Sequence, residues 1–128
     1  MNRSIADLDE AGLRAWLARY KTAWEQKEPD QAAALFTVDA TYQETPYADP
    51  LQGRDAIRDY WAGVTADQSG IEFTFLPISV SGQTGVAQWF ARFRSISGDV
   101  AVELNGIFVL EFAADGEVSS LREWWHAR

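Results

Sequence analysis

The chain has 128 residues, a formal net charge of −8 at pH 7 and no cysteine. Binding to nucleic acid phosphates needs clustered Lys and Arg, so 19 acids against 11 basic residues argue against a nucleic acid partner. Without cysteine there is no disulfide, thiol nucleophile or thiolate metal site, and a chain of this length suits one domain over 1–128.

The sequence predicts neither a secretory signal nor a membrane span. The first thirteen residues contain several acids and no apolar core of a signal peptide. No apolar run reaches the roughly 18 residues that a membrane span requires. We therefore expect a cytoplasmic protein that does not bind membranes.

The first half of the chain has the periodicity of helices. A stripe with spacings of three and four predicts a helix over 7–27, and Pro29 suits the first turn of a short second helix that continues to Phe36. Residues 40–45 then read as a strand. After the turn that ends at Gly53, a third helix is predicted. The apolar positions of the first and third helices are Leu13, Trp16, Leu17, Tyr20 and Trp24, and Ile57, Tyr60, Trp61 and Val64.

Beyond Gly70 the periodicity changes from helical to alternating. Strands are predicted at 71–80, 84–96, 100–113 and 117–126, separated by SGQTG, SGD and ADG, which are typical of hairpin turns. Helices followed by an antiparallel meander predict an α+β fold. In the last strand, Val118 and Leu121 have opposite parity, which predicts a β-bulge between them.

The strand over 100–113 alternates most regularly. Its face from Val102 to Phe112 is continuously apolar, and we expect it to pack on the helices. Its other face mixes Ile107 and Val109 with acids. This outer face suits the interface of a homodimer, and a solvated face fits nearly as well.

Several local motifs match one family pattern. These are ARY at 18–20, DAT at 39–41, the run P-x-x-G-x-x-A-I-R-x-Y from Pro50 to Tyr60, and the closing ADGEVSSLREWW. With the predicted order of elements, the chain resembles the SnoaL-like proteins of the nuclear transport factor 2-like superfamily, which include polyketide cyclases and ketosteroid isomerases. The resemblance covers nearly the whole chain. It implies three helices packed on a curved, mostly antiparallel sheet that encloses a pocket.

The ketosteroid isomerase pattern aligns without gaps from Ala18 to Trp61. In this register, Glu44 falls on the general base and Tyr20 on the tyrosine that donates to the enolate oxygen. Phe108 falls on the second oxyanion donor, which in the isomerase is an aspartic acid that keeps its proton because its site is apolar. Because phenylalanine cannot donate, half of that oxyanion hole is missing, and steroid isomerisation of that kind is not expected.

A second acid is implied near the end of the chain. SnoaL-like cyclases resemble this chain in carrying an acid/base residue on the final strand, and Glu123 is the nearest match. The same register turns Trp125 toward the cavity. Two carboxyl groups in one apolar cavity push their pKa values apart, so that one acts as acid and the other as base.

The aromatic side chains have a functional and a structural interpretation. Six tryptophans are many for a small domain, and we expect several aromatic residues to line the pocket. They could instead fill the cone completely, which would leave only a dimerising scaffold. The predicted lining residues are Trp16, Trp24, Trp61, Trp89, Phe108 and Trp125.

The candidate acids also have structural alternatives. Glu44 could be a solvated strand end, alone or paired with Arg54 or Arg58, and Glu123 could form a buried salt bridge to an arginine of the first helix. His126, the one histidine, is expected to face outward. No metal-binding spacing, phosphate loop or dinucleotide motif is present, so any reaction should need no cofactor.

The sequence thus predicts a pocket for a small apolar, oxygenated and cyclic molecule. If the protein is an enzyme, we expect isomerisation, cyclisation or water addition beside a carbonyl. Glu44 would take the proton, Tyr20 would stabilise the oxyanion and Glu123 would return a proton. The alternative is a binding or assembly module without catalysis.

Overall fold

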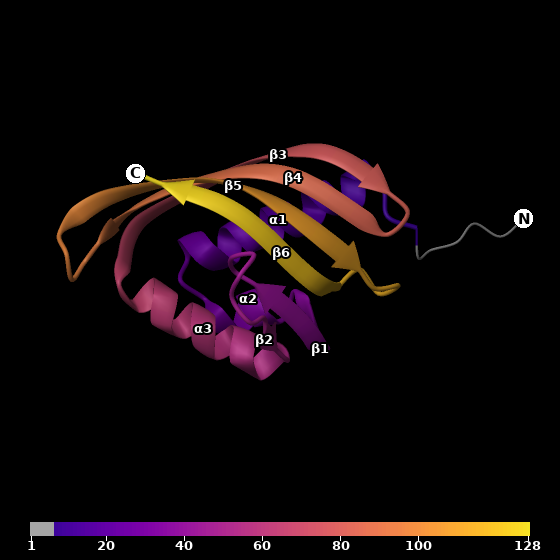
Figure 1. Ribbon diagram of the computed structural model, residues 1–128, viewed down its shortest axis with the longest axis horizontal. Helices are drawn as coiled ribbons and strands as arrows, with labels where there is room; N and C mark the ends of the chain where they lie inside the picture. Colours follow the sequence, from indigo (N-terminus) through magenta and orange to yellow (C-terminus); the bar gives the residue numbers. More distant parts are fainter. Residues whose placement is uncertain (1–6) are drawn as a thin grey trace, which may run out of the picture.

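Four long strands arch over the helices in the computed structural model, which describes residues 7–128 (Figure 1). These residues form three helices and one six-stranded sheet with the order β2-β1-β6-β5-β4-β3. The helices are α1 (Glu10–Glu25), α2 (Pro29–Ala33) and α3 (Arg54–Ala66). The strands are β1 (Phe36–Gln43), β2 (Leu51–Gln52), β3 (Gln68–Ser81), β4 (Thr84–Ser95), β5 (Val100–Phe112) and β6 (Val118–Ala127).

The sheet is mixed, because one of its pairs is parallel. β3 to β6 form the antiparallel meander that the turn sequences predict. β1 then lies parallel to β6, and the two-residue strand β2 pairs with β1 at the edge. The α+β cone predicted from the sequence is therefore confirmed. The parallel pair brings the end of β1 beside the middle of β6, where Gln43 pairs with Arg122, so the two candidate acids that follow these residues come from neighbouring strands.

The helix α1 is fixed at its start and along one face. The Asp9 side chain caps it by accepting a hydrogen bond from the Gly12 amide at 2.8 Å. Its apolar stripe is buried beneath the sheet, as the spacing predicts. The buried residues are Leu13, Trp16, Leu17, Tyr20, Ala23 and Trp24.

The second helix is shorter than predicted, and the strand after it begins earlier. α2 ends at Ala33, and β1 already begins at Phe36. The reason is that the Leu35 carbonyl is engaged elsewhere: it accepts from the Val118 amide at 2.9 Å and from the Trp16 indole at 3.0 Å. Pairing with β6 therefore replaces the last part of the helix that was predicted to continue to Phe36.

The predicted bulge in β6 is confirmed. Phe112 pairs with Val118, and Glu111 pairs with Ser120, so the register shifts by one residue between them. As a result, Val118 and Leu121 are both completely buried despite their opposite parity. The shift also turns Glu123 and Trp125 to the inner face.

A glycine makes room for the aromatic inner face of the sheet. Gly106 on β5 pairs with Trp89 on β4, and a Cβ added to it would lie 2.6 Å from Cε2 of the Trp89 ring. Real Cβ atoms do not approach so closely, so only glycine lets Trp89 lie flat across the neighbouring strand. Trp89 in turn stacks on Phe108, with ring centroids 5.2 Å apart.

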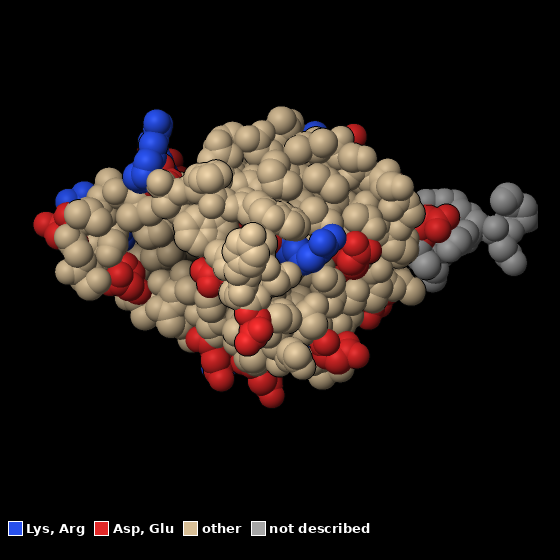
Figure 2. Space-filling view, in the orientation of Figure 1, with Lys and Arg blue, Asp and Glu red and all other residues tan. Residues whose placement is uncertain are grey.

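The outer face of the sheet carries both charges and exposed apolar side chains. Leu76, Phe90 and Trp124 are each more than two-fifths exposed on it. Several of the acidic groups visible in Figure 2 lie along the lower border, where Figure 1 places α3, and others lie toward both ends of the view. Within residues 7–128, no helix has the length and apolar character needed to cross a membrane.

Candidate active site

A cavity of about 280 Å³ lies between the helices and the inner face of the sheet. Eight of its fifteen lining side chains are aromatic. Each major element contributes to it: α1 supplies Tyr20, the segment from β1 supplies Glu44, α3 supplies Tyr60, and β6 supplies Glu123 and Trp125. Residues that are far apart in sequence therefore meet around one apolar space with a few polar groups, which is the usual composition of a small-molecule site.

A larger groove of about 560 Å³ lies at the surface of the strands and has a different character. Its charged groups are already paired with one another, Arg92 with Glu72 at 3.0 Å and Arg128 with Glu103 at 2.8 Å. All four side chains are at least half exposed, so these pairs are ordinary surface salt bridges. Beyond these pairs, the only titratable side chain among the described residues that line the groove is the exposed His126, whereas the smaller cavity brings two acids and three tyrosines together and is the candidate site.

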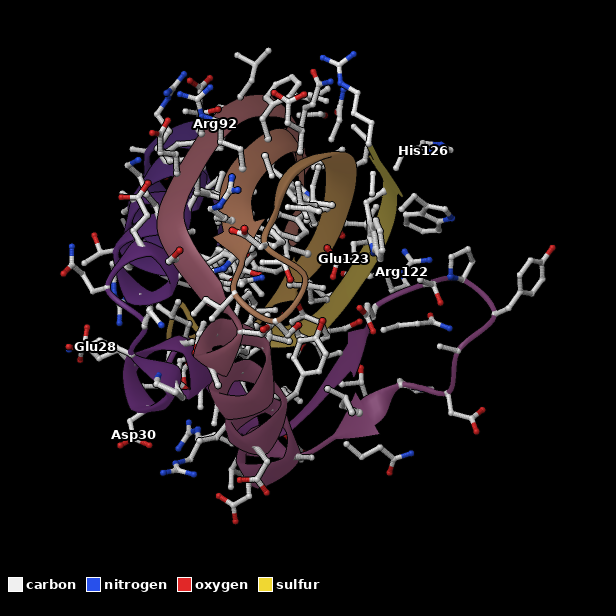
Figure 3. The ribbon with its side chains drawn as sticks, turned by 90° about the vertical axis from the view of Figure 1, so that its left-hand side faces the viewer. Glu28, Asp30, Arg92, Arg122, Glu123 and His126 are labelled. Atoms are coloured by element: carbon white, nitrogen blue, oxygen red, sulfur yellow. The ribbon has the colours of Figure 1, made fainter. Side chains whose placement is uncertain are left out.

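Glu123 is the buried acid of the cavity. It is only 5% exposed, and burial raises its pKa to about 8, with a hydrogen bond from Tyr42 lowering it and the charge of Glu44 raising it. Near neutral pH it is therefore mainly a neutral carboxyl group that can donate a hydrogen bond. In Figure 3, Glu123 lies within the curve of the sheet, whereas Arg122 and His126 extend from the other side of β6.

The structural alternative for Glu123 is wrong. Within residues 7–128, its carboxylate forms no salt bridge with Arg or Lys. Arg14 of α1 instead pairs with Glu10, one turn away on the same helix. A buried carboxyl without a cationic partner is costly when ionised, which is why its proton is retained.

Two tyrosines form the hydroxyl pair next to Glu123. The hydroxyl oxygens of Tyr20 and Tyr42 lie 3.3 Å apart, and both side chains are 2% exposed. Burial, and next to it the charge of Glu123, raises the pKa of both phenols well above the ordinary value. Both therefore remain protonated donors across the physiological pH range.

Glu44 lies directly after β1, at the half-buried edge of the cavity. Its backbone carbonyl accepts a hydrogen bond from the Trp125 indole at 3.0 Å, which ties this segment to β6. Tyr60 lies against its carboxylate. Burial raises the pKa of the Tyr60 phenol above its ordinary value, and the charge of Glu44 and a hydrogen bond to it contribute in the same direction.

The structure does not pair Glu44 with either of the two arginines that the sequence offered as partners. Arg54 donates to the Phe36 carbonyl at 2.7 Å and to Glu117 at 3.2 Å, and Arg58 pairs with Asp30. Both arginines thus have other partners, and Glu44 is oriented by Tyr60 instead.

The aromatic residues divide between the cavity wall and the core. Trp24, Trp61, Trp89 and Trp125 line the cavity. Trp16 and Phe108 do not, which corrects the expectation that they would. Trp16 is held in the core because its indole donates to the Leu35 carbonyl, and Phe108 is completely buried behind the Trp89 ring. The aromatic side chains thus surround the space and do not fill it.

The second hydrogen-bond donor of the cavity lies beside position 108. Phe108 on β5 is the direct cross-strand partner of Glu123 on β6. The carboxyl that the isomerase pattern would place at 108 is absent, but a neutral carboxyl lies on the neighbouring strand and lines the same cavity. The arrangement therefore contains one partly exposed carboxylate, one buried carboxyl and protonated phenols, which together suit proton transfer beside a carbonyl.

Sequence reasoning missed Tyr42 and Tyr60 as site residues. Tyr42 precedes Glu44 by two positions, so strand parity alone places both on one face. Tyr60 carries a weaker signal, because the helical spacing identifies it only as part of the apolar face of α3. His126 is exposed, as predicted. Among residues 7–128, no cluster of three or more metal-ligating side chains of the His, Asp and Glu types is present.

Comparisons with known proteins identify the family of the chain. The sequence profile of the SnoaL-like domain matches residues 17–121. A steroid Δ-isomerase from Nocardioides simplex is 30% identical over 115 residues, which covers 90% of each chain.

Solved structures show the same architecture. SalBIII, described as an epoxide hydrolase/cyclase-like enzyme in pyran ring formation in the polyether salinomycin, superposes with a TM-score of 0.75 at 23% identity, over 92% of this chain and 93% of its own. A protein of ketosteroid isomerase-like fold from Catenulispora acidiphila, in complex with trimethylamine, gives 0.75 at 16% identity, over 85% of this chain and 83% of its own. At these identities the likeness concerns the fold.

Proposed function

The chain belongs to the SnoaL-like domain family, and from this premise we propose that its cavity catalyses cofactor-free proton transfer on a small cyclic carbonyl compound. The reaction that the site suits best is an isomerisation that moves a carbon–carbon double bond into conjugation with the carbonyl. The observation that carries the proposal is the meeting of Glu44, Tyr20 and Glu123 at one aromatic-walled cavity.

The proposed reaction needs only these side chains. The Glu44 carboxylate takes a proton from the carbon between the carbonyl and the double bond, and the electron pair moves to the carbonyl oxygen. The Tyr20 hydroxyl and the neutral Glu123 carboxyl donate hydrogen bonds to that oxygen as its negative charge develops. Glu44 then returns the proton to the far end of the dienolate, so that the proton balance is closed and the double bond ends in conjugation.

The size of the cavity favours a substrate smaller than a steroid. Pockets for drug-sized ligands typically occupy about 300–1,000 Å³, and this one measures about 280 Å³. We therefore propose a monocyclic or bicyclic ketone, although the isomerase relative is named for steroids.

The test is an absorbance assay for the conjugated product with two substrates, cyclohex-3-enone and an unconjugated 3-oxosteroid. We expect the protein to isomerise the small ketone faster than the buffer does and to prefer it to the steroid in kcat/KM. Turnover of neither ketone above the buffer rate would contradict the proposal, and a preference for the steroid would contradict its size argument.

A second candidate function, binding without turnover, is favoured by Phe108. This buried side chain removes a donor from the position where the isomerase pattern has one. The relative from Catenulispora acidiphila is named by its fold and its bound trimethylamine, which gives a precedent for a binding protein. Binding of the small ketone without any turnover would favour this candidate.

We also infer that the outer face of the sheet pairs with a second copy of the chain. This face exposes Leu76, Phe90 and Trp124, and its row of Glu72 and Arg92 carries both signs of charge. A twofold interface brings the same patch of both copies together. A patch with both signs of charge and apolar centres suits such an interface, whereas acidic helices would place like charges against each other.

The dimer can be tested by light scattering after gel filtration. We expect twice the chain mass for the wild type, and a monomer for Phe90→Glu because a charge would be buried at the centre of the interface. Tyr47→Glu, at a fully exposed position on the segment between β1 and β2, is the control and should remain dimeric. A monomeric wild type at micromolar concentration would contradict the inference.

A further inference from the structure

The polar groups of the cavity include no cationic side chain. Its lining contains two acids, Glu44 and Glu123, and neither Lys, Arg nor His. The rest of the chain strengthens this bias, because the formal net charge is −8. An anionic ligand would enter against the charges of the site and of the whole protein, whereas a cation would be attracted by both.

The walls of the cavity are suited to an organic cation. Trp24, Trp61, Trp89 and Trp125 come from four different elements and surround the same space. The faces of indole rings attract cations, and this attraction is largest when the ring and the cation are both removed from water. Trp24, Trp61 and Trp89 are 2–5% exposed, so three of the four rings are removed from water.

Glu123 keeps its proton near neutral pH. Burial raises the pKa of this carboxyl to about 8, against a hydrogen bond from Tyr42 that lowers it, and the charge of Glu44 raises it further. The titratable groups packed around it are Tyr20 from α1, Tyr42 and Glu44 from β1 and the residue after it, and Tyr60 from α3. None of them becomes positive, so the missing counter-charge would have to come from a ligand.

We propose that this aromatic cavity binds compact quaternary or tertiary ammonium compounds, with Glu44 and Glu123 as counter-charges and the tryptophan rings as the walls of the cage. A trimethylammonium group is smaller than the cavity and leaves room for a short substituent. Its methyl groups would pack on the rings, and its charge would be balanced by the acids. This inference concerns binding and does not depend on the proposed isomerisation.

The test compares choline with 3,3-dimethylbutan-1-ol, which has the same shape but carbon in place of the charged nitrogen. Affinities are measured by titration calorimetry and by tryptophan fluorescence. We expect choline to bind at least tenfold more tightly than the alcohol at pH 7.5. Equal affinities, or no saturable binding of choline up to about 50 mM, would overturn the proposal.

The pH dependence of choline affinity gives a second test, since the charge of choline does not change with pH. Bound choline favours the ionised form of Glu123. The pKa of Glu123 in the free protein is about 8, so below this pH the binding of choline releases a proton. We expect the affinity to rise by up to tenfold per pH unit toward pH 8 and then level off. A flat profile between pH 6 and 8 would count against Glu123 as a counter-charge.

Two variants separate local from general electrostatics. Glu123→Gln keeps the shape of the side chain, and we expect it to reduce the preference for choline over the alcohol at least fivefold and to remove the pH dependence. Asp49→Asn removes one charge from an exposed position beyond Glu44. It should leave the preference for choline and the pH dependence of its affinity unchanged. An equal loss in the two variants would mean that only the net charge of the protein matters, which would overturn the proposal.

These outcomes are distinct from those of the isomerase assay. Choline binding without ketone turnover would refute the proposed reaction and support the cation site. Turnover of the ketone without choline binding would support the proposed reaction and refute the cation site. If both are found, we expect choline to inhibit the isomerisation competitively, because one cavity serves both ligands.

Discussion

Replacement of Glu44 by glutamine should lower kcat for isomerisation of the small ketone by about 10²–10⁴-fold. The amide cannot take a proton, so the first step of the reaction loses its base. The fold should persist for two reasons. The Trp125 indole holds the backbone carbonyl of residue 44 and not its side chain, and glutamine can still accept a hydrogen bond from Tyr60.

The control for this variant is Asp49→Asn, at an exposed position of the same segment. It removes the same charge without touching the cavity, and its kcat should equal that of the wild type. Thermal unfolding of both variants should lie close to that of the wild type. A Glu44→Gln protein that is folded and fully active would remove Glu44 from the mechanism.

Replacement of Tyr20 by phenylalanine has the second largest expected effect. The variant keeps the ring that packs against Trp16, Trp24 and Trp61, but loses the hydroxyl that is proposed to donate to the developing oxyanion. Loss of one such donor costs about 10²–10³ in kcat. KM should change little, because a hydrogen bond that strengthens in the transition state contributes little to ground-state binding.

Tyr42→Phe is the matched comparison, because its hydroxyl lies 3.3 Å from that of Tyr20 and belongs to the same pair. If Tyr42 only orients Tyr20, its loss should reduce kcat less than the loss of Tyr20 does. A larger reduction for Tyr42→Phe than for Tyr20→Phe would instead make Tyr42 the direct donor to the substrate oxygen.

The sequence predicts much of the architecture because the periodicities are strong. The stripe from Leu13 to Trp24 and the alternation from Val102 to Phe112 identify the inner faces directly. The first is buried in the structure, and the second is buried from Gly106 to Phe112 and half-buried at Val102 and Leu104. The bulge in β6 could also be predicted, because Val118 and Leu121 both need burial and have opposite parity. These features depend only on local pattern.

The boundary between α2 and β1 could not be predicted for a physical reason. Ala32 to Phe36 has the composition of a helix end, and its structure is decided by pairing of Leu35 with Val118, far away in the chain. The strand β2 was missed because two residues carry no detectable alternation. In both cases tertiary hydrogen bonds override local preference.

The sequence predicts which acids belong to the site but not how the side chains of the site are arranged. The position of Glu44 at a strand end and the parity of Glu123 follow from the sequence, whereas the hydrogen bond from Trp125 to the Glu44 carbonyl depends on a side-chain rotamer. The same limit applies to Trp16 and Phe108. Both lie on the correct inner faces, but Trp16 stacks on Tyr20 and Phe108 stacks on Trp89, and it is Tyr20 and Trp89 that line the cavity.

The most direct test of the central claim is proton removal itself, measured without any isomerisation. The α-protons of cyclohexanone exchange with D₂O when a base removes them, and nuclear magnetic resonance follows their loss. We expect the wild-type protein to accelerate this exchange in proportion to its concentration, and Glu44→Gln to reduce the acceleration at least a hundredfold. Exchange at the buffer rate with the wild type, or equal acceleration by the two proteins, would contradict the assignment of Glu44 as the base.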